Sequence, residues 1–238
     1  MMQHSSPAPV QGPAFVRLLA RLAGEGRASA ATPLADRLGQ WVDWNRAVVL
    51  AGALDGRLPE PEAEPLAFDA EEVERECTLA RQALVQAIGQ APELAPGPDA
   101  TAAVSPPDFA AFRKRHATLQ QSMLAATGRL RGRLRDLLAA RPAPLRRLAE
   151  LDAAMERVLG PREYALLAMV PDLLERRFLH LRGHAQAPAD DIFSASADAT
   201  AGRTWLDLFR HDMRAVLLSE LDVRFHPIEG LLEALRTR

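Results

Sequence analysis

The sequence predicts an all-α protein: a multi-helix bundle of about seven or eight helices with one long central helix and no sheet. Aromatic residues make up 5% of the 238 residues, and alanine, leucine and arginine dominate the chain. Such a composition favours helix nearly throughout, because β-branched and aromatic residues are the ones that prefer strands. Apolar residues also recur at spacings of three and four, the period of one helix face.

The chain begins with a polar, proline-bearing stretch, residues 1–11, which we expect to be a disordered arm. An N-terminal helical unit over residues 12–91 follows it. Its first helix starts at Pro13 and is stopped by Gly24 and Gly26. The apolar face of this helix has the spacing of one buried stripe and consists of Phe15, Leu18, Leu19 and Leu22.

Two further helices complete the N-terminal unit. Thr32 followed by Pro33 is a typical helix start, and we expect this second helix to run to about Leu54. A linker rich in proline and glutamate follows at residues 57–66. Asp69 then caps a third helix, and the glutamates of its first turn suit the positive end of the helix dipole.

A second linker, residues 92–107, contains five prolines and separates the N-terminal unit from a C-terminal helical bundle over residues 108–238. The central helix of that bundle spans residues 108–141, and Pro142 and Pro144 end it. Its apolar stripe resembles the seam of a coiled coil and includes Phe112, His116, Leu119, Met123, Ala126, Leu130, Leu134, Leu137 and Leu138.

Prolines divide the rest of the predicted bundle. A fifth helix stops at Gly160-Pro161, and a sixth ends where Pro171 takes the first position of a new helix. After a loop of small residues at 185–202, a long helix over residues 204–225 is interrupted by Pro227. A short amphipathic helix follows, with the apolar residues Ile228, Leu231, Leu232 and Leu235.

Composition excludes several classes of protein. The net charge of −2 is too small to attract nucleic acid or membranes over the whole surface. Cys77 is the only cysteine, which excludes an internal disulfide and a multi-cysteine zinc site. The first residues lack the features of a secretory signal, and no apolar run is long enough to span a bilayer. We therefore expect a cytoplasmic protein without a transmembrane segment, which contacts a membrane only through a partner.

Charge is distributed unevenly along the chain. Residues 108–147 hold ten basic and two acidic residues, whereas residues 55–76 hold nine acidic and two basic ones. The two regions either face each other or lie on different solvated surfaces; alternatively, the arginine-flanked stripe of the central helix docks a protein partner. The candidate partner-binding residues are Arg129, Leu130, Arg131, Arg133, Leu134, Arg135 and Leu137.

Nucleic acid or an anionic membrane is a further alternative for the arginine cluster. A helix lying in a membrane surface would use bulky aromatic residues, but this helix has them only at Phe109 and Phe112, far from the arginines. We therefore favour a protein partner or self-association over both.

Two residue pairs have a spacing that suits a metal ion. His180 and His184 are four residues apart, as are Asp207 and His211, and zinc sites use such pairs on one helix face. No third ligand is evident, and the chain has no P-loop, dinucleotide fingerprint or nucleophile elbow. We assign no catalytic residue, metal ligand or cofactor, and a metal-dependent helical enzyme is the least favoured alternative.

Three segments resemble a known family: residues 12–22, residues 35–54 with the tryptophans Trp41 and Trp44, and residues 225–235. They are similar to the proteobacterial family known as domain of unknown function 3348, and the resemblance extends over nearly the whole chain. The resemblance implies no assigned activity and no catalytic residues. It also implies, through neighbouring genes, a cytoplasmic accessory of an envelope-associated complex. We thus expect a non-enzymatic helical interaction or adaptor protein, with a nucleic-acid-binding regulatory module as the alternative.

Overall fold

The structure, a computed structural model, describes residues 14–22, 24, 44–56, 69–95, 108–186 and 205–237. Within these residues the chain forms helices and no strand, so the predicted all-α class is confirmed. The predicted arm, the helix start at Thr32, Trp41 and residues 187–202 of the predicted loop lie outside the described residues.

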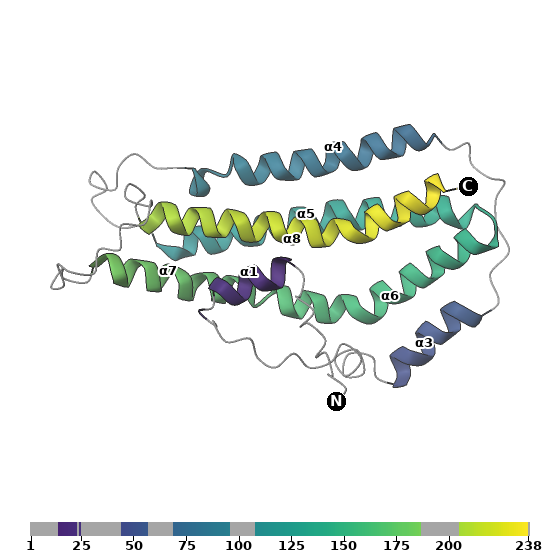
Figure 1. Cartoon of the computed structure of the whole chain (residues 1–238), viewed down its shortest axis with the longest axis horizontal. Coiled ribbons are helices and arrows are strands. Elements are labelled where there is room, and N and C mark those ends of the chain that lie inside the picture. Colours follow the sequence, from purple (N-terminus) through teal and green to yellow (C-terminus); the bar gives the residue numbers. More distant parts are fainter. Residues whose placement is uncertain are drawn as a thin grey trace, which may run out of the picture.

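The long helices lie side by side in an elongated bundle (Figure 1). The helices in chain order are α1 (Ala14–Leu22), α3 (Trp44–Asp55), α4 (Ala70–Gly89), the short 3-10 helix η1 (Pro92–Leu94), α5 (Phe109–Ala139), α6 (Ala143–Leu167), α7 (Val170–Gln186) and α8 (Trp205–Arg236). In Figure 1, α5 and α8 run in the same direction, with α4 antiparallel on one side and α6 followed by α7 antiparallel on the other. α1 packs on α8 and α7, and α3 packs on α6.

The central helix α5 forms as the sequence predicts. Asp108 caps it, because its carboxylate accepts a hydrogen bond from the backbone N–H of Ala110 at 3.2 Å. Inward-facing residues follow at spacings of three and four, from Phe112 to Leu138, and they are buried. The helix ends at Ala139, where Pro142 prevents its continuation.

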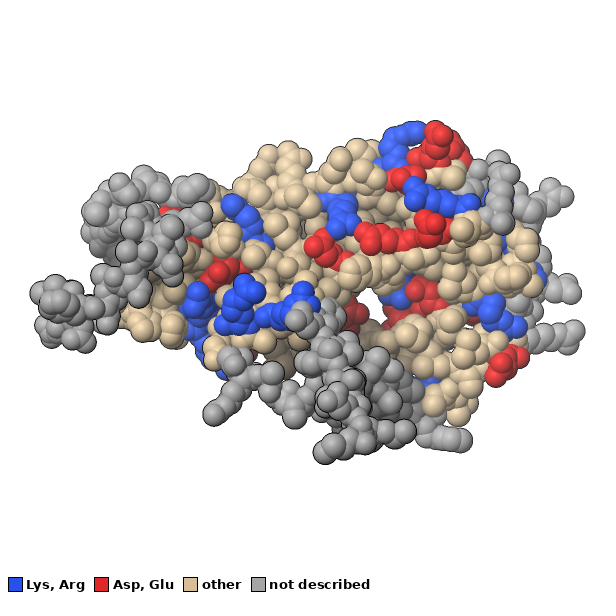
Figure 2. All heavy atoms as spheres, in the orientation of Figure 1, with Lys and Arg blue, Asp and Glu red and all other residues tan. Residues whose placement is uncertain are grey.

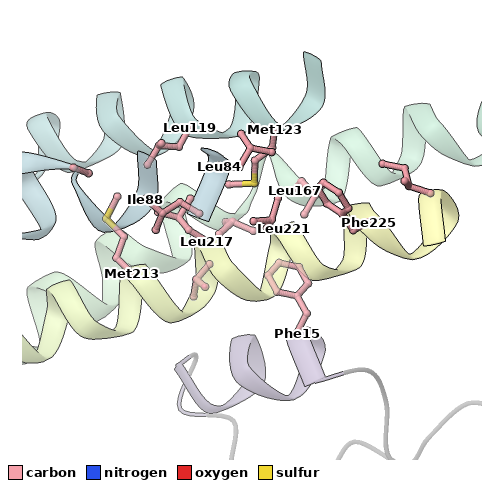
Figure 3. Close-up of a cluster of buried hydrophobic side chains, with 14 of the residues drawn as sticks. Phe15, Leu84, Ile88, Leu119, Met123, Leu167, Met213, Leu217, Leu221 and Phe225 are labelled. Atoms are coloured by element: carbon pink, nitrogen blue, oxygen red, sulfur yellow. The ribbon is translucent and has the colours of Figure 1, made fainter. Parts of the chain in front are cut away.

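α8 supplies the centre of the hydrophobic core. Met213, Leu217 and Leu221 are almost completely buried and lie among side chains of α5 and α4 (Figure 3). Burying a side chain of this size stabilises the fold by about 1.5–3 kcal/mol. α1 contributes Phe15 to the same core from the outer side of α8.

An aromatic cluster closes the bundle where α5 and α8 begin. Its rings come from α5, α7 and α8, and neighbouring centroids lie 5.0–6.1 Å apart. Most of these contacts are edge-to-face, the arrangement that aromatic quadrupoles favour. The members of the cluster are Phe109, Phe112, Phe178, Trp205 and Phe209.

The first part of the predicted linker at 92–107 forms a buried turn. Leu94 of η1 lies in the core, and Arg210 and Arg214 of α8 donate hydrogen bonds to the carbonyl oxygens of Glu93 and Leu94 at 3.2 and 3.0 Å. Residues 96–107 lie outside the described residues. The division of the chain into two units at this linker stays a prediction.

Two helix breaks that the sequence predicts are wrong. α6 continues through Pro161 to Leu167, and α8 continues through Pro227 to Arg236, so the C-terminal bundle has fewer separate helices than predicted. A proline inside a helix costs about 3 kcal/mol. Buried residues on both sides of each proline, such as Phe225 and Ile228 in α8, offset that cost. The restart near Pro171 is confirmed, since α7 begins at Val170.

Candidate functional site

The leucines of the predicted partner site lie inside the protein. Leu134 is 1% exposed, Leu130 is also buried, and Leu137 is partly buried against the core. Within the described residues, helices of the same chain therefore cover the stripe for which we predicted a partner.

Three arginines of the predicted site form ion pairs with two neighbouring helices, α6 and α4. Arg131 donates two hydrogen bonds to the carboxylate of Asp152 on α6, both at 2.8 Å. Arg135 pairs with Asp152 and Glu156 on the same helix, and Arg133 pairs with Glu76 on α4. Of the alternatives that the sequence left open, contact between the arginine-rich and acidic regions occurs at Glu76, whereas α6 supplies the carboxylates that pair with Arg131 and Arg135.

The paired charges of α5 and α6 are mostly shielded from water. Burial alone would lower the pKa of Arg131, but its hydrogen bond to Asp152 and the nearby carboxylates raise that pKa above the usual value. Bidentate pairs of this kind fix the relative position of two helices. Arg129, by contrast, is exposed on the other flank of α5.

A cleft of about 550 Å³ opens beside this ion-pair group. α5 provides Leu124 and Gly128, α6 provides Met155 and Tyr164, and α8 closes the far side. Figure 2 shows the cleft as an opening between α8 and α6. We call it the α5–α6–α8 cleft. Of the seven predicted site residues, Arg131 lines it.

Two glycines leave room for the cleft. Gly128 of α5 and Gly160 of α6 both line it, and a Cβ atom added to either would meet no other atom within 4 Å. A glycine inside a helix is about 1 kcal/mol less favourable than alanine. Neither glycine is required by close packing of the described helices, and neither places a side chain in the cleft.

Exposed apolar side chains line the mouth of the cleft. Tyr164 is 67% exposed, Leu124 is 49% exposed and Met155 is 37% exposed. Scattered exposed apolar residues are common on protein surfaces, but these three share one concave surface.

Pro227 changes the α8 side of the cleft. Because proline has no N–H, the carbonyl oxygen of Val223 lacks the donor that it would have in a regular helix. Residues four apart lie on one helix face, and both Val223 and Pro227 line the cleft. The carbonyl oxygen of Val223 therefore accepts no hydrogen bond from the backbone of residue 227.

A buried polar group lies directly behind the α8 wall. Glu220 has no exposed surface; Arg224 donates two hydrogen bonds to one of its oxygens at 2.9 and 2.7 Å, and Gln120 of α5 donates to the other at 2.9 Å. Arg224 also lines the cleft. The pairing neutralises a carboxylate that would be very unfavourable alone in the core.

His116 belongs to the same polar group. It is completely buried one turn before Gln120, and neither ring nitrogen has a hydrogen-bond partner among the described residues. Burial lowers the pKa of His116, while the charge of Glu220 and the nearby amide of Gln120 act in the opposite direction. The buried ring is therefore harder to protonate than an imidazole in water.

Sequence reasoning placed His116 on the apolar stripe but missed the polar group around it. A signal was present: Glu220 occupies a position between Leu217 and Leu221, on the apolar stripe of α8, and Arg224 follows it by one turn. A charged residue in such a stripe is rarely buried unless it is paired.

The two pairs with metal-binding spacing do not come together. The Nε2 atoms of His180 and His184 lie 3.2 Å apart on the exposed face of α7. Asp207 instead pairs with Arg210, and Asp212 pairs with Arg177 on α7. In the part of the chain that the structure describes, no three His, Cys, Asp or Glu side chains are placed to hold a metal ion.

Searches of curated proteins and of solved structures find no match to this chain. Among the described helices, none combines the length and the apolar character needed to cross a membrane. The profile of one family, described as a protein of unknown function (DUF3348), matches residues 1–237. This match covers essentially the whole sequence, and the chain therefore belongs to the DUF3348 family.

Proposed function

We propose that the protein is a non-enzymatic helical interaction protein, which receives a segment of a protein partner in the α5–α6–α8 cleft. The observation that carries the proposal is the cleft itself, because its apolar walls are filled by no side chain of the described residues. Exposed Tyr164 and Met155 at its mouth belong to the residue types that are enriched in protein interfaces. Grooves between helices commonly receive an amphipathic helix of a partner.

The proposed interaction surface is the cleft and not the leucine stripe of α5. Leu130 and Leu134 are occupied by the core, whereas Gly128 and Arg131, on the same helix, reach the cleft. The arginines that suggested nucleic acid support that alternative poorly, since Arg131 and Arg135 already neutralise carboxylates of α6. Phosphate binding needs basic side chains that are free to replace counterions.

The family resemblance supports a finer proposal for the setting of the interaction. We propose that the protein acts in the cytoplasm as an accessory of an envelope-associated complex and reaches the membrane through its partner. The absence of a spanning helix among the described residues is compatible with this arrangement.

Site-specific crosslinking in the native cell tests the cleft as an interaction surface. A photoreactive phenylalanine replaces Tyr164 in the full chain, and a parallel variant carries it at Leu79, an exposed residue of α4. We expect a discrete protein adduct from position 164 and none of that mass from position 79.

A matched pair of glycine variants shows whether the adduct depends on the cleft. Gly128→Leu places a side chain in the cleft, whereas Gly132→Leu adds the same side chain one turn later, at a position that does not line the cleft and where an added Cβ meets no atom within 4 Å. We expect Gly128→Leu to remove the adduct and Gly132→Leu to retain it. An adduct that survives Gly128→Leu, or equal adducts at both crosslinking positions, would contradict the proposal.

A further inference from the structure

We infer that the cleft selects a cationic partner segment: an amphipathic helix that inserts apolar side chains and places an arginine or lysine beside Glu163 of α6. The inference rests on the proposed function and specifies the chemistry of the partner. Two features of the walls carry it: arginines that are already held in ion pairs, and one carboxylate outside these pairs.

Both arginines that line the cleft are already engaged. Arg131 binds Asp152 and Glu156, and Arg224 binds Glu220. The positive charges of these two arginines are therefore neutralised by carboxylates of the same chain and are not available to bind an incoming anion.

Glu163 is the carboxylate left outside these pairs. It lies at the exposed edge of the cleft and, among the described residues, makes no hydrogen bond or ion pair, although its charge acts on Arg131. Low-dielectric walls strengthen the field of such a charge inside a cleft. Glu163 therefore attracts a cationic group.

Arg224 cannot change partners without a large penalty. An anionic ligand that recruited it would leave Glu220 charged and completely buried, with Gln120 as its remaining donor. Removing one member of a buried ion pair is strongly unfavourable because the other charge stays uncompensated. The buried group behind α8 thus disfavours acidic partners.

Arginine and lysine side chains carry only donors, so either can bind the Glu163 carboxylate. A carboxylate of the partner would be repelled by the charge of Glu163. Glu163 therefore favours a cation next to the apolar contacts.

A helix-biased peptide display library, selected on the full protein, tests the inference. Sequences retained on the Gly132→Leu protein but lost on the Gly128→Leu protein are counted as dependent on the cleft. We expect these sequences to share apolar residues on one face and to carry arginine or lysine beside it far more often than aspartate or glutamate.

The best cleft-dependent peptide is then measured by fluorescence anisotropy against the wild type and Glu163→Gln. Loss of the carboxylate should weaken binding by about threefold to tenfold. The same peptide with glutamate in place of its basic residue should bind more weakly than with glutamine at that position.

The outcomes separate the two proposals. If no peptide depends on the cleft, the proposed function is overturned along with the inference. If cleft-dependent peptides carry acidic residues as often as basic ones, or Glu163→Gln leaves their affinity unchanged, the cleft still binds partners but the charge selection is wrong.

Discussion

The two ends of the α5–α8 pair are packed in different ways. At the end where both helices begin, α7 contacts both of them through the aromatic cluster, with Phe178 within 5.0 Å of Phe209 between ring centroids. At the other end α6 is held to α5 by Arg131 and Asp152, and the space between α6 and α8 remains open. The large aromatic rings fill the space between α5, α7 and α8. The ion pairs join α6 to α5 but leave a cleft between α6 and α8.

The aromatic end should carry much more stability than the cleft end. Phe209 has no exposed surface and contacts three other rings, so Phe209→Ala should lower the free energy of unfolding by about 3–5 kcal/mol. Met155→Ala, at the cleft mouth, should change it by less than about 0.5 kcal/mol. Urea unfolding measures both, and equal losses would show that the two ends do not differ in this way.

The polar group between the two ends should be the most sensitive part of the cleft wall. Arg224→Met leaves Glu220 buried without its cation and should destabilise the protein by about 3 kcal/mol. Arg224→Met combined with Glu220→Leu should recover most of this loss, because no buried charge then remains. Unfolding of the single and double variants measures the difference; a double variant as unstable as the single one would contradict this account.

His116 should make stability depend on pH. Burial keeps its pKa in the folded protein below the unfolded value of about 6.5, against the opposing effects of Glu220 and Gln120. The neutral ring therefore stabilises the fold above that pH, and this contribution is lost as pH falls toward the folded pKa, by at most about 1.4 kcal/mol per pH unit.

His116→Met removes this group and provides the measurement. Urea unfolding at about pH 7.5 and about pH 5.5 should show a smaller loss of stability in the variant than in the wild type. Glu220, Gln120 and Arg224 remain in both proteins, so the comparison isolates the contribution of His116. Equal losses would show that His116 is already charged or free to ionise in the fold.

The smallest expected effect concerns the glycine at the cleft. Gly128→Ala should stabilise the protein by somewhat less than about 1 kcal/mol, since alanine is the better helix former and its Cβ meets no atom within 4 Å. Gly132→Ala should have a similar effect at its position outside the cleft. Thermal unfolding compares the two; destabilisation by Gly128→Ala alone would show that the cleft is more closed than described.

Local signals predicted α5 well, because Asp108 caps it and its apolar residues keep a spacing of three and four. The same local reasoning failed at Pro161 and Pro227. The tendency of a proline to end a helix is a local property of its backbone. Whether the helix nevertheless continues depends on contacts with distant parts of the chain, such as those of Phe225 and Ile228 with the core.

The candidate site was harder to predict for a related reason. The predicted residues Leu130 and Leu134 are correctly apolar, but periodicity cannot say whether the helix that covers a stripe belongs to the same chain. The cleft needs Gly128, Tyr164 and Pro227 from three helices, and no spacing along the sequence relates them. Ion pairs such as Arg131 with Asp152 likewise depend on how α6 turns back along α5.

The parallel course of α5 and α8 governs the order in which the molecule acquires its structure. Two neighbouring helices that run in the same direction cannot be joined by a short turn, and here α6 and α7 return along the bundle between them. During synthesis the apolar side of α5, including Leu119 and Met123, emerges long before the Met213 and Leu217 side chains that cover it. Contacts between such distant segments form slowly, so the nascent chain carries an uncovered hydrophobic surface until α8 has left the ribosome.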